Sequence, residues 1–226
     1  MKIGIIGSGV VGQTLGTSLA QSGHDVVLGT RDPGKLGDKR GYGESLSDWL
    51  EKAGPTARVA TFDEAARHGE VVINATAGTA SLKALEAAGK ANLEGKILID
   101  VANPLDFSKG MPPTMTVCNT DSLGEQVQRA FPKAKVVKTL NTVNASVMVA
   151  PEKLGGGDHA IFVCGEDAAA KTEVAHYLND WFGWRLDSVI DMGGIEASRG
   201  TEMLLPLWIR LMGALGTPMF NFRIVR

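Results

Sequence analysis

Short apolar runs alternate with amphipathic stretches along most of the chain. The runs lie at residues 3–6, 26–28, 58–60, 71–73, 97–99 and 136–137. They do not alternate between apolar and polar positions, so both faces of each run are suited to burial. This pattern is typical of parallel strands that helices cover on both sides. It predicts at least six buried strands.

Amphipathic stretches between these runs predict helices over residues 10–21, 45–52, 61–67, 81–88 and 122–130. Thr61 and Glu64 have the spacing of a capping box, in which each side chain binds the other residue's backbone N–H. The alternation of strand and helix predicts an α/β fold of the Rossmann type, with a doubly wound, mainly parallel sheet.

The rhythm changes after Asn141. A glycine turn at 155–157, a strand at 160–164 and a helix at 167–181 follow, and then a helical stretch at 195–215 that Pro206 interrupts. We place a boundary near residue 145, between a domain over 1–145 and a small C-terminal α/β-helical domain over 146–226. The last stretch has apolar residues at helical spacing, which favour core or dimer-interface packing over a cofactor contact. These are Met203, Leu204, Leu207, Leu211 and Leu215.

Composition narrows the class of protein. The 226 residues are 44% hydrophobic and 21% charged, with a net charge of -2, which fits a folded globular chain and argues against nucleic acid or an anionic membrane as partner. The two cysteines, Cys118 and Cys164, form no CxxC pair, so neither a disulfide framework nor a metal site is expected. No signal peptide and no apolar stretch of roughly 18 residues is present. We expect a soluble, unprocessed, cytoplasmic protein.

A glycine-rich motif directly follows the first predicted strand. Gly7-Ser8-Gly9-Val10-Val11-Gly12 matches GxGxxG and opens the first predicted helix. In such a turn Gly7 allows the tight bend, Gly9 lets a pyrophosphate approach the backbone, and Gly12 lets helix and strand pack closely. The motif predicts a dinucleotide site. The alternative is a glycine turn that binds nothing.

The end of the second strand indicates which dinucleotide binds. Many NAD sites carry a carboxylate there for the ribose 2′-hydroxyl, but this chain has Thr30 and Arg31, with Lys35 nearby. A hydroxyl and two cations suit the 2′-phosphate of NADP. Asp32 could serve a ribose, although starting the Asp-Pro turn is its plainer role. We therefore favour NADP(H).

Small polar residues follow three later strands, where the nicotinamide end of the cofactor is expected. They could orient a carboxamide and a ribose, or merely cap helices and turns. The candidate contacts are Asn74, Ala75, Thr76, Ala77, Ala102, Asn103 and Asn141. No catalytic acid is evident, and the lone His159 is better explained as a surface or core residue. Hydride transfer between planar rings needs alignment more than proton transfer.

Several segments together resemble the coenzyme F420-dependent NADP oxidoreductases, and the resemblance spans nearly the whole chain. They are 1–9, 29–32, 103–104, 137–142 and 193–199. The resemblance implies an NADP-binding Rossmann domain, a small C-terminal domain that closes the cleft, a homodimer, and hydride transfer between nicotinamide and the 5-deazaflavin of coenzyme F420. By motif, Thr30, Arg31 and Lys35 resemble the family's 2′-phosphate binders. Residues 75–77, Asn103 and Asn141 would line the nicotinamide side.

The leading hypothesis is an NADP(H)-dependent oxidoreductase that moves a hydride to or from a planar small-molecule acceptor, coenzyme F420 or a flavin. The alternatives are reduction of a small imine or carbonyl, reduction of ferric iron, and a non-catalytic NADPH-binding redox sensor. The charged segment 34–43, with Lys35, Lys39 and Arg40, is either a solvated loop or a seat for an anionic tail.

Overall fold

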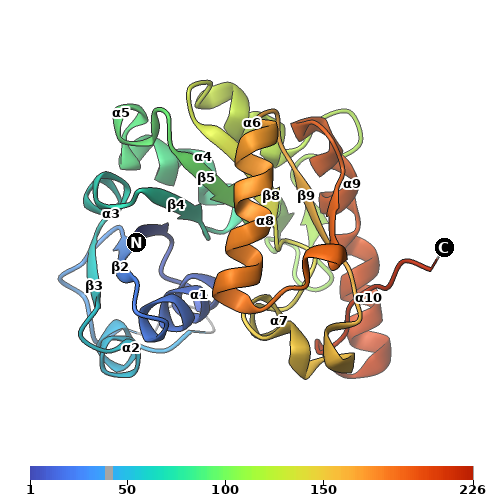
Figure 1. The fold of residues 1–226 in the computed structure, drawn as a ribbon, viewed down its shortest axis with the longest axis horizontal. Coiled ribbons are helices and arrows are strands. Elements are labelled where there is room, and N and C mark those ends of the chain that lie inside the picture. The colour runs from blue at the N-terminus through green and yellow to red at the C-terminus, as the bar shows by residue number, and fades with distance from the viewer. Residues whose placement is uncertain (39–42, 226) are drawn as a thin grey trace.

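The computed structural model describes residues 1–38 and 43–225, so Lys39 and Arg40 of the charged segment lie outside the described residues. The described chain forms an eight-stranded sheet with the order β10-β9-β8-β5-β4-β1-β2-β3 (Figure 1). Its strands are β1 (Lys2–Ile6), β2 (Asp25–Thr30), β3 (Ala57–Thr61), β4 (Val71–Asn74), β5 (Ile97–Asp100), β8 (Lys135–Thr139), β9 (Ile161–Cys164) and β10 (Val189–Asp191).

Helices connect the strands. They are α1 (Val10–Gln21), α2 (Leu46–Ala53), α3 (Phe62–His68), α4 (Gly78–Ala88), α5 (Lys90–Leu93), α6 (Leu123–Ala130), α7 (Ala145–Met148), α8 (Ala168–Phe182), α9 (Ser198–Met203) and α10 (Leu205–Leu215). Short 3-10 turns lie at η1 (Pro151–Lys153), η2 (Gly155–Gly157), η3 (Leu186–Ser188) and η4 (Ile195–Ala197). The predicted capping box is present at α3, where Thr61 and Glu64 bind each other's backbone N–H.

The mainly parallel, doubly wound sheet predicted from the sequence is confirmed. All neighbouring strands from β3 to β8 run parallel, whereas β9 runs antiparallel to β8 and β10 runs parallel to β9. Residues after 145 thus supply two strands to the same sheet, and the domain boundary near residue 145 stays a prediction.

The core has two layers, one on each face of the sheet. On one face α1, α2 and α8 bury Leu15, Trp49 and Leu178, and on the other α4 and α6 bury Leu85 and Val127. In Figure 1 α8 crosses in front of the sheet. Because both faces are covered, the central strands are mainly apolar, as the sequence pattern predicted, with buried polar residues near their carboxyl ends.

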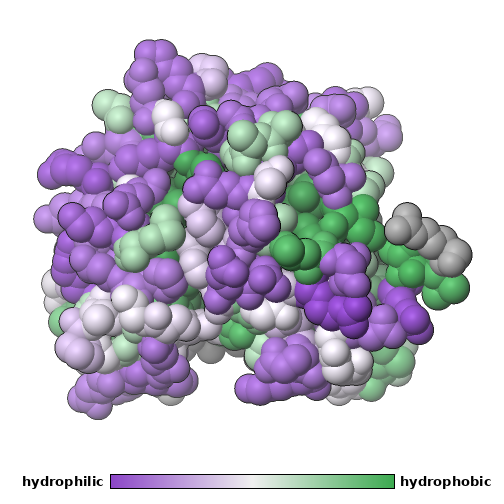
Figure 2. Space-filling view, viewed as in Figure 1, coloured by the Kyte–Doolittle hydropathy of each residue, from purple (hydrophilic) through white to green (hydrophobic). Residues whose placement is uncertain are grey.

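The C-terminal helices leave an apolar surface. Leu207 and Leu215 of α10 are 51% and 56% exposed, and Met203 of α9 is also exposed. Figure 2 shows hydrophobic surface on the side of the molecule where α9, α10 and the C-terminal segment lie. Pro206 stands in the first turn of α10, where a proline costs no hydrogen bond. The apolar residues at helical spacing between Met203 and Leu215 are therefore not part of the buried core of this chain.

A small hairpin interrupts the main rhythm between β5 and α6. Its strands, β6 (Leu105–Asp106) and β7 (Thr114–Met115), pair antiparallel outside the main sheet. Phe107 and Met111 between them are exposed. Within the described residues, no helix has both the length and the hydropathy needed to cross a bilayer. The cytoplasmic location stays a prediction.

Candidate functional site

The glycine motif forms a turn between β1 and α1. Gly7 has φ 119°, a conformation that disfavours other residues. A Cβ at Gly12 would lie 2.0 Å from the carbonyl oxygen of Gly7, so only glycine lets α1 approach this closely. Gly9 is the N-cap of α1, and a Cβ there would meet nothing within 4 Å. Gly7, Ser8 and Gly9 line a cavity, and the first N–H groups of α1 have no acceptor within their own helix, an arrangement suited to a phosphate.

Two adjoining cavities extend from this turn along the carboxyl ends of the strands. The first, about 700 Å³, is lined by the turn, the end of β2 and the sides of α3 and α4. The second, about 320 Å³, reaches Ala102, Asn103 and the exposed Phe107 of the hairpin. Both are lined by residues 75–77 after β4. We call the two cavities together the cleft.

The β2 end of the cleft carries the residues predicted for the 2′-phosphate, with one exception. Thr30 is buried and accepts a hydrogen bond of 3.2 Å from the Ser8 hydroxyl, and Arg31 lines the larger cavity. The Asp32 carboxylate accepts from the N–H of Gly34, as its predicted turn role requires. The Lys35 side chain is 64% exposed, pairs with Asp32 and does not line the cavity.

The asparagine after β4 plays a different part from the one its position suggested. Asn74 is fully buried. Its amide nitrogen donates to Ser81 and, at 2.8 Å, to Asp100, while its amide oxygen accepts from the Thr76 hydroxyl at 2.7 Å. Asn74 therefore holds Thr76 in place, and Thr76 is the member of this group that lines both cavities.

Behind Asn74 lies a buried group of three charges. The Lys138 ammonium lies 2.9 Å from Asp100 and 2.8 Å from Glu202, and all three side chains are almost completely buried. Glu202 also accepts from the N–H groups of Leu123 and Gly124 at the start of α6. Burial alone lowers the pKa of Lys138, but the two carboxylates outweigh it and raise that pKa above its ordinary value. Lys138 is thus a permanent cation in the protein interior.

The other two asparagines bind each other. Asn103 donates to the Asn141 carbonyl at 2.7 Å, and the Asn141 amide donates to the Asn103 side-chain oxygen at 3.0 Å. Asn103 lines the smaller cavity, whereas Asn141 is buried and lies behind it. The pair ties the loop after β5 to the loop after β8 and fixes the direction of the Asn103 amide.

Sequence reasoning missed four charged residues of this region. Lys83 on α4 lines the larger cavity, as Arg31 does, and adds a second cation to its lining. Asp100, Lys138 and Glu202 were not singled out either. A lysine within the apolar run of β8 was the available signal, because a charge on a strand buried on both faces must have a partner. Glu202 comes from α9, and no local pattern connects it with β8.

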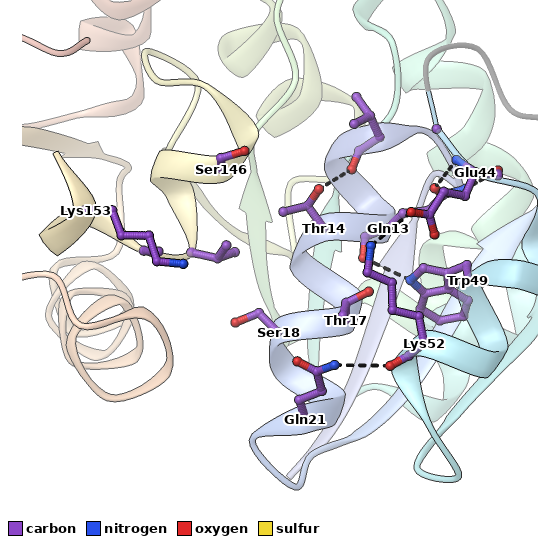
Figure 3. A pocket seen from close by; sticks show the side chains of 14 residues that line it. Gln13, Thr14, Thr17, Ser18, Gln21, Glu44, Trp49, Lys52, Ser146 and Lys153 are labelled. Carbon is purple, nitrogen blue, oxygen red and sulfur yellow. Dashed lines mark hydrogen bonds and ion pairs between the residues drawn. The ribbon is translucent and has the colours of Figure 1, made fainter. Parts of the chain in front are cut away.

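Two other features lie apart from the cleft. A polar cavity of about 460 Å³ lies along α1, between α2 and the segment after α7 (Figure 3). Val10 of the glycine motif lines this cavity, whereas Val11 lines the smaller cavity of the cleft. His159 is buried, with its ring nitrogens bonded to the Pro151 carbonyl and the Asn221 amide. The interpretation of His159 as a core residue is confirmed.

This chain is similar in sequence and structure to known proteins of one family. Residues 2–104 match the family described as coenzyme F420-dependent NADP oxidoreductase. A crystal structure from Arthrobacter sp. FB24, described as a candidate F420-dependent NADP reductase, is 56% identical with a TM-score of 0.93, and each chain is covered completely. The F420-dependent NADP reductase of Methanothermobacter marburgensis is 28% identical over 93% of this chain and 92% of its own length.

A relative from an animal matches in part. The metalloreductase STEAP3 of Rattus norvegicus is 29% identical over 92% of this chain, and the match spans 38% of that protein. The remainder of that longer protein lies outside the match. The similarity therefore concerns one portion of a longer protein.

Proposed function

This chain belongs to the family of coenzyme F420-dependent NADP oxidoreductases, and from this premise we propose that it binds NADP(H) in the cleft and catalyses hydride transfer between nicotinamide and coenzyme F420. The family makes it an NADP-dependent oxidoreductase. The choice of F420 over other acceptors, and the direct transfer of hydride, are our proposal.

One observation carries the cofactor assignment. The glycine turn opens into a cavity at the helix N-terminus, and that cavity has Arg31 and Lys83 among its lining residues. The N–H groups of α1 suit a pyrophosphate, and a guanidinium suits a terminal phosphate. Asp32, the carboxylate nearest the end of β2, is engaged in its turn and is not among the lining residues. Asp63 at the start of α3 does line the cavity, but its carboxylate is bound by Arg67 and Asn92. The residues present therefore fit NADP(H) better than NAD(H).

The chain itself supplies binding and alignment. When bound, NADPH supplies the hydride. The chain can hold its phosphates with the turn and the two cations, and it can orient the nicotinamide with Thr76 and Asn103, which line the smaller cavity. Phe107 at the rim of that cavity offers an apolar surface to a flat acceptor ring. The hydride passes between two ring carbons, and the reduced deazaflavin takes up one proton at a ring nitrogen, which solvent at the open cleft can supply.

A spectroscopic assay tests this proposal. Purified protein is mixed with NADPH, and absorbance is followed in parallel with F420, FMN, ferric citrate, a cyclic imine or no acceptor, with NADH as the control donor. We expect NADPH oxidation with F420 and much slower oxidation of NADH. If the protein oxidises NADPH with one of the other acceptors and not with F420, that acceptor is the substrate and the proposal of F420 is wrong. NADPH binding without turnover in any well would favour a redox sensor.

We also propose that the protein is a homodimer and that a second copy covers α10. The sequence of α10, LPLWIRLMGAL, is apolar on nearly every side, yet only Leu205 is buried. Exposed apolar surface on this scale is typical of an interface. Light scattering after size exclusion measures the mass, and Leu207→Asp should shift it from two chains to one. A wild-type mass of one chain would rule out the dimer.

A further inference from the structure

The direction of the hydrogen bonds behind the cleft is fixed by the buried lysine. The Lys138 ammonium can only donate, and its three hydrogens are taken by Asp100, Glu202 and, at 2.5 Å, the carbonyl of Ala102. The other Asp100 oxygen faces two nitrogens, the N–H of Ala102 and the amide of Asn74. Asp100 therefore acts as an acceptor on both oxygens.

The Asp100 carboxylate in turn fixes the amide of Asn74. Since Asp100 can only accept, Asn74 must turn its nitrogen toward it, and the second hydrogen of that nitrogen goes to the Ser81 hydroxyl. The Asn74 oxygen then faces the Thr76 hydroxyl. A flipped amide would set a nitrogen against Thr76 and an oxygen against a carboxylate, which is repulsive.

The Thr76 hydroxyl is left with one possible role toward the cleft. Its single hydrogen is used on the Asn74 oxygen. The Ser81 hydroxyl, 2.7 Å away, accepts from Asn74 and donates to Thr76. Thr76 keeps one lone pair, and its half-buried side chain lines both cavities of the cleft. It can accept a hydrogen bond there but cannot donate one.

We propose that the closed ring of hydrogen bonds among Asn74, Ser81 and Thr76 makes Thr76 an obligate acceptor toward the cleft, and that Thr76 selects the carboxamide N–H of the nicotinamide and so fixes the orientation of the nicotinamide. This inference rests on the proposed function. The ribose hydroxyls can rotate to donate or accept, so an acceptor of fixed polarity offers them no selection. The carboxamide nitrogen is a permanent donor, and only a permanent acceptor distinguishes it from the carboxamide oxygen. Asn74 and Ser81 are positioning residues, and Thr76 is the contact.

Calorimetric titration with two ligands tests this inference. NADP⁺ and its 3-acetylpyridine analogue differ in that a methyl group replaces the carboxamide NH₂. Wild-type protein should bind NADP⁺ about ten times more tightly, the size of one hydrogen bond. Thr76→Val should bring the ratio of the two affinities close to one, and Thr76→Ser should keep the wild-type ratio.

The matched pair Asn74→Ala and Asp100→Asn tests the ring itself. Asn74→Ala opens the ring and frees the Thr76 hydrogen, so Thr76 can donate to the cleft and the ratio should fall toward one. In Asp100→Asn the Asn74 amide can turn either way. If it flips, Ser81 donates to the Asn74 oxygen and Thr76 donates to Ser81, so the Thr76 hydrogen is still used inside the ring. Asp100→Asn should therefore keep the wild-type ratio, and thermal melts report folding of both.

The outcomes separate the two proposals. If wild-type protein binds neither ligand, the proposed function fails. If it binds both equally, or if Thr76→Val keeps the wild-type ratio, NADP(H) binding stands and the role of Thr76 is wrong. If folded Asp100→Asn changes the ratio as much as Asn74→Ala, the effect is one of buried charge and the role of the ring is wrong. Should Asn74→Ala not fold, the two Thr76 variants decide the acceptor role by themselves.

Discussion

The two ends of the cleft are built in different ways. The proposed phosphate end is a continuous segment, residues 7–12, which offers backbone N–H groups with glycines around them. The proposed nicotinamide end is supported by side chains on β4, β5, β8 and α9. The first end needs only local geometry, whereas the second needs the whole chain to fold before its charges are paired. The same cleft thus combines a locally encoded site with a globally encoded one.

The largest effect should come from removing the cation at the nicotinamide end. Lys138→Met leaves Asp100 and Glu202 buried beside each other without a counter-ion. We expect a loss of about 3–5 kcal/mol in the free energy of unfolding, measured by urea denaturation. Lys133→Met is the control, because its pair with Glu94 lies on the surface, and it should change stability little. Equal losses of unfolding free energy in the two variants would contradict the argument that Lys138 matters because its ion pairs are buried.

At the phosphate end, affinity should change without stability. Arg31→Ala removes the guanidinium that lines the larger cavity and should weaken NADPH binding by about 1.5–3 kcal/mol, the scale of a charged hydrogen bond. NADH binding and the melting temperature should hardly change. Lys35→Ala should have a smaller effect, because this lysine is not in the lining of the cavity. Equal losses for NADPH and NADH would exclude a 2′-phosphate contact.

Substitution of two glycines of the same turn should affect different properties, stability at Gly12 and cofactor affinity at Gly9. Gly12→Ala sets a Cβ against the Gly7 carbonyl and should destabilise the fold by about 1–3 kcal/mol, as overpacking does. Gly9→Ala meets no atom within 4 Å, so the melting temperature should stay, while the new methyl group hinders the approach of a phosphate. Fluorescence titration should show weaker NADPH binding for Gly9→Ala, and an unchanged affinity would mean that no phosphate approaches there.

The smallest effect concerns pH at the helix beside the buried charges. A hydrogen bond from Arg129 holds the pKa of Asp121 at about 2, below its ordinary value of 3.8. Because the folded-state pKa is the lower one, the stabilisation is present above pH 3.8 and is lost as pH falls toward 2. Since the pair is largely solvated, we expect less than about 1 kcal/mol. Asp121→Asn should flatten acid denaturation curves over this range, and unchanged curves would contradict the pairing.

The same contrast explains what the sequence predicted. The order of strands and helices and the glycine turn follow from periodicity and spacing, which are local properties. The sequence treats Asn74, Asn103 and Asn141 as equivalent, but one is buried against Asp100 and the other two bind each other. Which way an asparagine faces depends on neighbours from distant strands. The contact between Lys138 and Glu202 is tertiary in the same sense.

The reversal of β9 was also beyond the sequence. Its apolar run looks like any buried strand, and only its pairing with β8, with Lys138 opposite Cys164, shows that it runs antiparallel. The direction depends on the connection through α7 and the two short turns before β9, and no local periodicity records it. The sequence therefore predicted the existence of this strand but not its direction.

The hairpin between β5 and α6 has an evolutionary consequence. It lies outside the main sheet, its tip is exposed, and Phe107 stands at the rim of the smaller cavity. Substitutions at the exposed tip touch neither buried layer of the core, so folding constrains this segment little. If the acceptor contacts this rim, as proposed above, a lineage can keep the sheet and the glycine turn and change its acceptor through substitutions in the hairpin. Diversification of such enzymes is then limited by the chemistry of the acceptor and not by the cost of refolding the scaffold.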